Sequence, residues 1–343
     1  MPALIFDLGG TFLRCAVSTE KGGTQLVRKE RIKSYIGGVS PPQVWDAVVN
    51  QMIRYQESVA GVVGPDDPIV LSFPGPVSRH QRVLNAPTVF GDTLNIPNPC
   101  TDLQRRTGRE TYVLNDVSAA AWYLSEQTEV NRFLVITVSS GVGAKLFDRD
   151  HPDRVISDPP YAGEIGHMAG DSDSEAILCD CGGRGHVGAI SSGRGIERLA
   201  RRAAKVDPIA FAASACAGLG ADAATLSNED HLVPAALDGD KWALSLITNC
   251  TRPLARAVLS VTLGAGLEQV IFIGGFALAL GDVYLRIMRG LLEELSQYSI
   301  LADYLPGLLK LGEMGEEASL QGAAIFANRV ALPELRMRLD GPR

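Results

Sequence analysis

The sequence predicts an α/β protein with two domains, and three observations support this prediction. The chain has 343 residues, whereas single hydrophobic cores stop growing at about 250 to 300 residues. Short apolar segments typical of strands alternate with longer segments of helical period. A strand, a glycine turn and a second strand occur twice, at 3–18 and at 133–147. This internal quasi-repetition predicts two lobes, each opened by the same element.

The first part of the chain contains the first of these elements. An apolar segment, Ala3 to Leu8, is interrupted by Gly9-Gly10-Thr11 and resumes at Leu13 to Ser18, which predicts a β-hairpin. A helix is predicted at 42–58, where apolar residues recur every three or four positions. Strands are predicted at 69–73, ending at Pro74-Gly75-Pro76, and at 111–114, followed by a helix at 117–126.

The second part repeats the pattern. We expect strands at 133–138 and 144–147 around the turn Ser139 to Gly143, then an alanine-rich helical excursion at 196–237. The remaining predictions are a long helix at 242–263, a strand at 269–273 before Gly274-Gly275, and helices at 283–296 and 319–328. Residues 1–115 are expected to form a small lobe, completed by the C-terminal helix at 319–334, and residues 116–318 a large lobe.

The composition excludes several classes of protein. Apolar residues make up 46% of the chain and charged residues 21%, which excludes disordered and fibrous proteins. The net charge is -7, and lysine and arginine are scattered, so a nucleic-acid partner is not expected. The N-terminus lacks a basic region, and no apolar run reaches the ~18 residues of a membrane span. We therefore expect a cytoplasmic protein with no membrane partner.

The glycine turns predict a nucleotide site. In Asp7-Leu8-Gly9-Gly10-Thr11, backbone N–H groups can approach phosphate oxygens, the Thr11 hydroxyl adds a donor, and Asp7 can hold water on Mg²⁺. Such a motif alone also fits a plain hairpin turn. The second turn, Ser139-Ser140-Gly141-Val142-Gly143, has the same phosphate-binding character, and Gly274-Gly275 suits close approach by adenine or ribose. The recurrence of such turns after three strands favours nucleotide binding.

Asn115-Asp116 follows a predicted strand end, where polar side chains usually face a ligand. Phosphoryl transfer to an alcohol needs a carboxylate that orients the hydroxyl and accepts its proton. The alternative is an Asx cap for the helix that begins at Val117. Both roles can coexist.

Two histidines and two cysteines predict a zinc site. Cys179 and Cys181 are two residues apart, His186 follows five residues later, and His167 lies upstream. Mixed sulfur and nitrogen ligands suit tetrahedral zinc in a reducing compartment. The alternative is two core thiols and two surface histidines. The other cysteines are expected to be small buried apolar residues: Cys15, Cys100, Cys216 and Cys250.

These motifs together resemble the ROK family (repressors, uncharacterised reading frames and sugar kinases) of the actin-like ATPase superfamily, over nearly the whole chain. They occur in the family's order: Asp7 to Thr11, Pro74-Gly75-Pro76-Val77, Asn115-Asp116, Glu164-Ile165-Gly166-His167, Cys179 to Gly185, Ser192-Gly193, Gly274-Gly275 and Gly322-Ala323-Ala324. The resemblance implies a two-lobed actin-like, ribonuclease H-like fold with an interlobe cleft, and it implies a homodimer.

The resemblance also implies roles for individual residues. Asp116 is expected to be the catalytic base, and substrate contacts are expected from Asn115, Glu164, His167, Pro74 and Gly75. ATP and Mg²⁺ are expected at Asp7, Gly9, Gly10, Thr11, Ser139, Ser140, Gly141, Gly143, Gly274 and Gly275. A structural Zn²⁺ is expected on His167, Cys179, Cys181 and His186, where it would fix the loop that carries Glu164.

Three positions depart from the family pattern. His186 stands where the family usually has a third cysteine, and zinc tolerates this exchange. Gly188 stands where the glucose and mannosamine kinases of the family have a glutamate that binds the far side of the sugar ring. The second turn reads Ser139-Ser140-Gly141 rather than Gly-Thr-Gly, which alters its ATP contacts. Loss of the glutamate removes a charged hydrogen bond of about 1.5 to 3 kcal/mol, so the preferred ring is expected to change.

These features predict ATP-dependent phosphorylation of a primary hydroxyl on a sugar-like ring, and they favour a C7-cyclitol (valiolone-type) 7-kinase. The close alternative is a ROK glucokinase or another hexose or acylated amino sugar 6-kinase, because a neighbouring residue or water could replace the glutamate. A ROK repressor is disfavoured, because its winged-helix domain would precede the first glycine turn, which here begins at Asp7. A non-catalytic sugar sensor is disfavoured by the presence of both Asp7 and Asp116.

Overall fold

The computed structural model describes residues 2–32, 39–91, 93, 96–156 and 161–333. The chain forms two compact units. Unit 1 comprises Met1–Glu129, Asp150–Ala162 and Met314–Arg343, and unit 2 comprises Val130–Arg149 and Gly163–Glu313. Among the described residues, no helix has the length and apolar character needed to cross a membrane.

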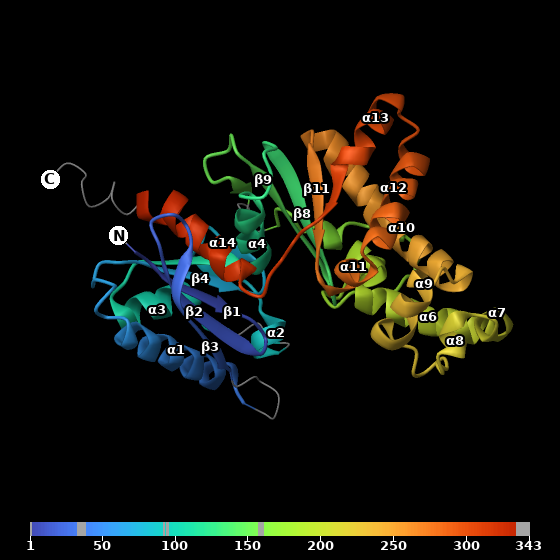
Figure 1. Cartoon of the computed structure of the whole chain (residues 1–343). Helices are drawn as coiled ribbons and strands as arrows, with labels where there is room; N and C mark the ends of the chain where they lie inside the picture. The colour runs from blue at the N-terminus through green and yellow to red at the C-terminus, as the bar shows by residue number, and fades with distance from the viewer. Residues whose placement is uncertain (1, 33–38, 92, 94–95, 157–160, 334–343) are drawn as a thin grey trace. The chain divides into compact units, whose positions relative to one another are not determined.

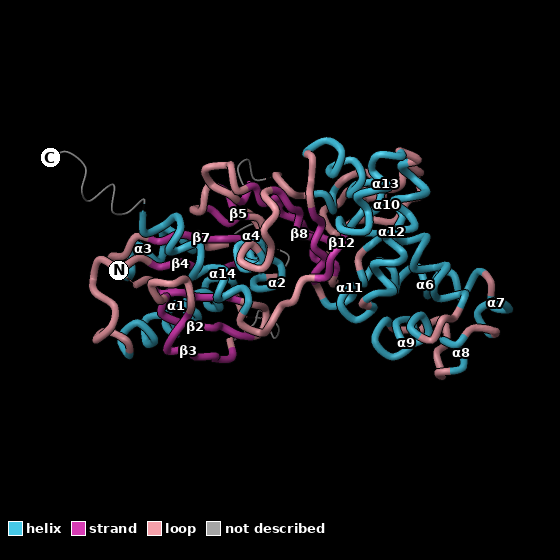
Figure 2. Tube along the Cα trace, turned by 45° about the horizontal axis from the view of Figure 1, so that its top comes forward, coloured by secondary structure: helices cyan, strands magenta, loops and turns pink. Residues whose placement is uncertain are grey.

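Unit 1 contains a mixed sheet with the strand order β3-β2-β1-β4-β7 (Figure 2). Its strands are β1 (Leu4–Leu8), β2 (Phe12–Ser18), β3 (Thr24–Arg31), β4 (Ile69–Phe73) and β7 (Thr111–Asn115). The first three pair antiparallel, whereas β1, β4 and β7 are parallel. The predicted hairpin and both later strands are confirmed. The parallel strands are buried throughout, as their continuous apolar sequences require.

Helices cover both faces of this sheet. On one face, α1 (Pro41–Ser58) buries Trp45, Val48 and Met52, and α3 (Pro99–Thr107) adds Leu103. On the other face, α4 (Asp116–Leu124) and α14 (Ala318–Phe326) pack together, although they are far apart in sequence (Figure 1). Short elements complete the unit: β5 (Val77–Ser78), β6 (Arg82–Val83), α2 (Pro87–Phe90), β10 (Val155–Ile156) and the π-helix Ala327–Ala331.

The contact between α4 and α14 depends on one glycine. A Cβ at Gly322 would lie 1.8 Å from the carbonyl oxygen of Ala119, so only glycine permits this approach. Trp122 and Phe326 then meet edge to face, with their ring centroids 5.9 Å apart. Because of this packing α4 belongs to unit 1, whereas the expected boundary at 115/116 assigned it to the large lobe.

The strands of unit 2 follow one another in the order β9-β8-β11-β12 within the second five-stranded sheet. They are β8 (Arg132–Val138), β9 (Val142–Asp148), β11 (Gln269–Ile273) and β12 (Leu309–Leu311). β8 pairs antiparallel with β9 and parallel with β11, as β1 does with β2 and β4 in unit 1. The core also draws on α5 (Val187–Ser191), α6 (Gly193–Val206), α10 (Lys241–Ala265), α11 (Gly275–Leu280), α12 (Asp282–Ser296) and α13 (Ser299–Leu308).

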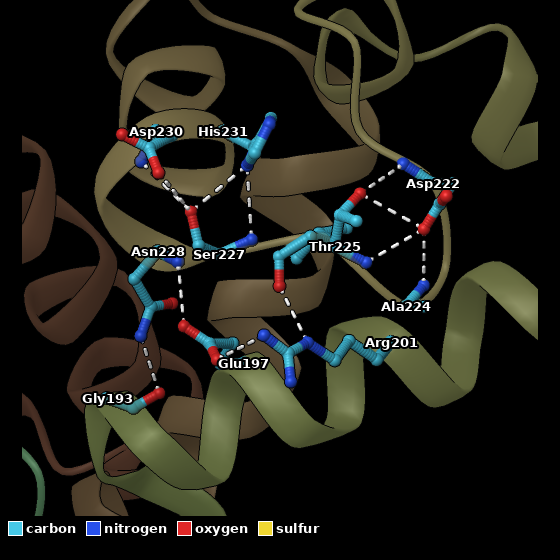
Figure 3. Close-up of polar contacts among 11 residues, drawn as sticks. Gly193, Glu197, Arg201, Asp222, Ala224, Thr225, Ser227, Asn228, Asp230 and His231 are labelled. Carbon is cyan, nitrogen blue, oxygen red and sulfur yellow. Dashed lines mark hydrogen bonds and ion pairs between the residues drawn. The ribbon is translucent and has the colours of Figure 1, made fainter.

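The helical excursion of unit 2 is confirmed but broken into short pieces. It contains α6, α7 (Pro208–Ala212), α8 (Ala215–Gly218), the π-helix Asn228–Leu232 and α9 (Val233–Leu237). Polar contacts tie the π-helix to α6 (Figure 3): Asn228 donates its backbone N–H to Glu197 Oε2 at 3.0 Å, and Glu197 pairs with Arg201 at 2.8 Å. These contacts fix the π-helix to α6, which begins beside the second glycine turn.

Candidate active site

The parallel strands of unit 1 end at one edge of the sheet, and this edge collects the predicted polar residues. The strand register places Asp7 opposite Ser72, and Phe73 opposite Asn115. Asp116 follows directly as the first residue of α4. Because carboxyl ends of parallel strands meet at one edge, residues distant in sequence come together here.

Asp7 lies at the entrance to the first glycine turn. The turn is closed by a hydrogen bond from Gly9 N–H to the carbonyl of Phe12, at 2.9 Å. Asp7 is 7% exposed and forms an ion pair with Arg14, with 3.2 Å between Oδ2 and Nη1. Burial raises the pKa of Asp7, while the neighbouring Ser72 hydroxyl and the Arg14 guanidinium oppose this rise. A buried carboxylate therefore lies beside a turn in which Thr11 is exposed to solvent.

Asn115 connects the strand edges to α4. Its Oδ1 accepts hydrogen bonds from the N–H groups of Val117 and Ser118, which caps the helix. Its Nδ2 donates to the carbonyl of Gly75 at 2.8 Å and to Asp116 Oδ1 at 2.9 Å. The predicted cap is thus present, and the same side chain also holds Asp116.

Gly75 is required by the turn that Asn115 contacts. Its φ is +112°, and a Cβ at this position would lie 2.0 Å from the carbonyl oxygen of Asn85. The Pro74-Gly75 turn therefore places a backbone carbonyl at the same edge as Asn115.

Asp116 has the properties expected of a general base. Its Oδ1 accepts from the backbone N–H of Val117 at 2.9 Å in addition to Asn115. Burial raises the pKa of Asp116 to about 6, with a further contribution from the negative charge of Asp7, and the hydrogen bonds oppose this rise. A carboxylate that changes protonation near pH 6 can accept a proton at neutral pH.

In unit 2 the second and third glycine turns lie together at the ends of β8 and β11. The strand register pairs Ile273 with Thr137. Gly274 follows with φ +93°, and a Cβ there would lie 2.7 Å from both Thr137 Oγ1 and the Val138 carbonyl oxygen. Within the second turn, Ser139 N–H donates to the Gly141 carbonyl at 3.0 Å.

The first residue of α6 joins these turns. Gly193 N–H donates to the Ser139 carbonyl at 2.7 Å, and its own carbonyl accepts from Asn228 Nδ2 at 2.7 Å (Figure 3). A Cβ at Gly193 would lie 3.0 Å from the Ser139 carbonyl oxygen and 3.2 Å from Phe276 Cβ. Backbone atoms of Gly193 and Ser139 are therefore in direct contact where α6 meets the second glycine turn.

The segment from Gly163 to His167 lies directly on β9. Cβ atoms at Gly163 and Gly166 would lie 2.2 and 2.3 Å from the carbonyl oxygens of Ala144 and Val142. Glu164 carries its carboxylate between two nitrogens: Oε1 is 3.9 Å from Lys145 Nζ, and Oε2 is 3.9 Å from His167 Nε2. Glycine at these positions thus sets where Glu164 and His167 project.

The predicted metal ligands form one cluster in unit 2. One donor atom from each of His167, Cys179, Cys181 and His186 lies within 4.8 Å of all the others. Cys181 Sγ is 3.2 Å from His186 Nδ1, and the two histidine Nδ1 atoms are 3.4 Å apart. Zinc bound by sulfur at ~2.3 Å and nitrogen at ~2.0 Å gives ligand separations of this size. The donor set therefore fits zinc.

The backbone around Gly188 leaves little space for a side chain. A Cβ there would lie 3.1 Å from the carbonyl oxygen of Gly166. Residues that sequence reasoning did not select also border these sites: Ser72, Arg14 and Lys145. The sequence signal that could have found two of them is a serine, Ser72, and a lysine, Lys145, in strands that are otherwise largely apolar. The roles of the site residues stay predictions. Asp7, Asn115 and Asp116 come together in unit 1, and Glu164 and the histidine–cysteine cluster come together in unit 2.

Comparison with known proteins identifies the family. Residues 4–330 match the ROK family. A C(7)-cyclitol 7-kinase of Streptomyces hygroscopicus subsp. jinggangensis is 36% identical over 340 residues, covering 96% of this chain and 95% of that protein. A second C(7)-cyclitol 7-kinase, of Streptomyces hygroscopicus subsp. limoneus, is 35% identical over 96% of this chain and 95% of its own length. An N-acetylmannosamine kinase of Citrobacter koseri is 28% identical over 95% of this chain and 99% of its own length.

Solved structures show the same fold. A ROK hexokinase from Thermus thermophilus has a TM-score of 0.72 at 22% identity, covering 97% of this chain and 99% of that chain. A ROK family transcriptional regulator described as a homologue of the E. coli MLC protein has a TM-score of 0.76 at 22% identity, covering 98% of this chain and 80% of that chain. The predicted two-lobed actin-like fold class is confirmed, and the match over residues 4–330 establishes that the chain belongs to the ROK family.

Proposed function

We propose that this chain is an ATP-dependent kinase that phosphorylates the primary hydroxyl of a C7-cyclitol of the valiolone type. The observation that carries this proposal is the 36% identity over 96% of the chain to a C(7)-cyclitol 7-kinase. A 2-epi-5-epi-valiolone 7-kinase of Actinoplanes is 27% identical over 95% of the chain, which supports the same substrate class.

Asp116 is proposed as the general base. Its carboxylate accepts the proton of the acceptor hydroxyl while the hydroxyl oxygen forms a bond to the γ-phosphorus. The bond between that phosphorus and the bridging oxygen breaks, and ADP leaves with the electron pair. The bond from Asn115 Nδ2 at 2.9 Å holds Asp116 Oδ1 in place, and the raised pKa of about 6 leaves the carboxylate ionised yet basic at neutral pH.

The glycine turns are proposed to bind the nucleotide. In unit 1, Asp7 with Gly9, Gly10 and Thr11 would hold water on Mg²⁺ and contact phosphate oxygens. In unit 2, the corresponding positions are Ser139, Ser140, Gly141, Gly143, Gly274 and Gly275. Mg²⁺ would supply charge neutralisation for the phosphates. The close backbone packing of Gly193 and Gly274 supports a role in which main-chain groups, not side chains, form this surface.

Zn²⁺ is proposed to be structural and to be held by His167, Cys179, Cys181 and His186. Because His167 lies three residues after Glu164, this cluster would hold the segment that supplies both proposed substrate ligands. Pro74 and Gly75 are proposed to contact the acceptor through the backbone turn. We further propose that the protein is cytoplasmic and forms a homodimer. Light scattering of the purified protein would test the dimer.

The experiment that tests the function is a coupled ATP-consumption screen across C7-cyclitols, hexoses and acylated amino sugars. We expect ADP release with a valiolone-type cyclitol, and NMR should place the new phosphate on the exocyclic hydroxymethyl oxygen. Turnover that is confined to a hexose would overturn the substrate class. Absence of ADP release with every acceptor, from protein that binds ATP, would overturn the kinase assignment.

A hexose or acylated amino sugar 6-kinase is the second candidate. The N-acetylmannosamine kinases, at 28% identity over 95% of the chain, favour it. Gly188 argues against it, because the glutamate expected of those kinases is absent and the nearby Gly166 carbonyl oxygen restricts a side chain there. The same screen separates the two candidates.

A further inference from the structure

One buried charge in unit 2 is not explained by the roles proposed above. Lys145 lies on β9 opposite Val135 of β8 and is 3% exposed. Side chains alternate along a strand, so Lys145 shares its face with Gly143 and Phe147. A buried ammonium is costly unless it is paired, and buried charges with a specific partner cluster at functional sites. The position therefore calls for a functional explanation.

One ion-pair partner of Lys145 is the proposed substrate ligand Glu164. Lys145 Nζ is 3.9 Å from Oε1 of Glu164, while Oε2 is 3.9 Å from His167 Nε2. Direct hydrogen bonds between nitrogen and oxygen span about 2.7 to 3.2 Å, so both separations are too long for one. An oxygen atom placed between each pair can lie within hydrogen-bond distance of both groups. The carboxylate thus has a gap of the same width on each side.

The backbone builds this arrangement. Gly163 has φ +82°, and a Cβ there would lie 2.2 Å from the Ala144 carbonyl oxygen and 3.3 Å from Lys145 Cδ. The turn at Gly163 therefore packs onto the aliphatic stem of the lysine, and Glu164 follows as the next residue. The backbone packing at Gly163 therefore positions Lys145 and Glu164 relative to each other.

We propose that Lys145 and Glu164 together bind one hydroxyl of the acceptor, which makes Lys145 a specificity-determining residue. This hydroxyl donates its hydrogen to Glu164 Oε1 and accepts a hydrogen bond from Lys145 Nζ. A second hydroxyl donates to Oε2 and accepts from His167 Nε2, whose ring presents Nδ1 to the cysteine cluster. The acceptor is therefore a ring with hydroxyls on two adjacent carbons. This inference deepens the proposed kinase function and rests on it.

The arrangement predicts how acceptors are discriminated. An acceptor without the first hydroxyl loses its hydrogen bonds to Lys145 Nζ and Glu164 Oε1, and a site built to bind a hydroxyl rejects analogues that lack it. Removing the ammonium leaves Glu164 paired on one side only. Acceptor binding should weaken, whereas nucleotide binding should not change.

The test compares Lys145→Met with wild type, using the acceptor that the ATP-consumption screen identifies. Methionine keeps the unbranched stem and removes the charge. We expect the KM for the acceptor to rise about tenfold or more, as for loss of a hydrogen bond to a charged group, with the KM for ATP unchanged. Lys310→Met is the matched control, because Lys310 lies on β12 of the same sheet, and its acceptor KM should equal that of wild type.

A double-mutant cycle separates positioning from a general structural effect. If Lys145 acts with Glu164, the fold increase in acceptor KM in the double variant Lys145→Met/Glu164→Gln should be far below the product of the fold increases in the two single variants. The thermal unfolding temperature of Lys145→Met should fall, because removing one member of a buried ion pair leaves the charge of its partner uncompensated. A purely structural lysine would show lower stability with normal acceptor KM.

Two results would overturn the proposal: an acceptor KM in Lys145→Met equal to wild type, or losses that multiply in the double variant. If the acceptor is a hexose, the cyclitol assignment fails while the lysine is still tested on that hexose. If no acceptor is phosphorylated, the same cycle is measured by denaturant unfolding. Absence of coupling between the two positions then overturns the pairing itself, independently of the kinase assignment.

Discussion

The two strand–turn–strand elements share one scaffold and differ in chemistry. In unit 1, β1 pairs antiparallel with β2 and parallel with β4; in unit 2, β8 pairs in the same way with β9 and β11. The first turn stands beside charged side chains, the Asp7–Arg14 ion pair and Asp116. The second turn is surrounded by backbone groups of Gly193 and Gly274. One repeated scaffold thus carries a charged edge in unit 1 and a main-chain surface in unit 2.

The largest expected effect comes from breaking the charged edge of unit 1. Asp116→Asn should lower kcat by about 10² to 10⁴, as for loss of a general base, with the fold intact. Because burial raises the pKa of Asp116, the ionised form destabilises the folded state above pH 6, so the variant should also unfold at about 2 °C higher temperature or more near neutral pH. Steady-state kinetics and thermal unfolding measure both effects.

Asp102→Asn is the matched control, because Asp102 also lies in the first turn of a unit 1 helix, α3. Burial acts to raise its pKa, but bonds from Arg105 and Trp45 outweigh burial, and its pKa is lowered. The control should therefore lose stability and keep its turnover. Wild-type turnover in Asp116→Asn would remove Asp116 from the mechanism.

The pH dependence should sharpen the same contrast. With the pKa of Asp116 at about 6, kcat should fall about tenfold for each pH unit below about 6 as the carboxylate becomes protonated. Since this pKa is raised above its unfolded value, the stability from the protonated group is full below about pH 4 and lost as pH rises through about 6. A flat kcat profile between pH 5 and 7 would contradict the assignment.

Removal of zinc should affect the acceptor-binding residues of unit 2. The purified protein should carry about one zinc per chain by elemental analysis. Removal by a zinc-selective chelator in excess Mg²⁺ should raise the KM for the acceptor about tenfold or more, because Glu164 and His167 lose their support. Cys181→Ser should reproduce this effect without chelator. Protein prepared without any bound zinc, yet with normal acceptor KM, would count against the ligand set.

The smallest effect tests the main-chain surface of unit 2. Gly274→Ala should lower the free energy of unfolding by about 1 to 3 kcal/mol, because its φ is +93° and its Cβ would meet Thr137 and Val138 at 2.7 Å. Gly141→Ala is the control: its Cβ would meet nothing within 4 Å, so stability should change by less than about 0.5 kcal/mol. Denaturant unfolding measures both. Equal losses in the two variants would show that the packing at Gly274 is unimportant.

Buried strands and long amphipathic helices could be predicted from the sequence because their residue patterns are strong. The edge strand β3 was missed, since its sequence TQLVRKER is polar and largely exposed. The short β12 was missed because three residues carry too little pattern. The α3 helix was also missed, although Asn98 caps it by accepting from Cys100 N–H. Local signals of this kind are weak without the tertiary contacts that stabilise them.

For the candidate site, clustering at the strand ends could be predicted because the sheet topology brings carboxyl ends together. The grouping of His167, Cys179, Cys181 and His186 could be predicted from their spacing, and one donor atom from each lies within 4.8 Å of the others. The pairing of Lys145 with Glu164 could not, because it depends on how the Gly163 turn packs onto β9. The ion pair of Asp7 with Arg14 depends likewise on a hairpin register that no motif encodes.

The close packing of Gly322 against Ala119 has a consequence for synthesis on the ribosome. The helix that covers α4 is translated only after all of unit 2, so the first 129 residues leave the exit tunnel without their final partner. Unit 2 is continuous in sequence apart from residues 150–162 and can mature while the earlier segment waits with an exposed apolar face. We expect nascent chains halted before residue 318 to need chaperones and to be readily degraded.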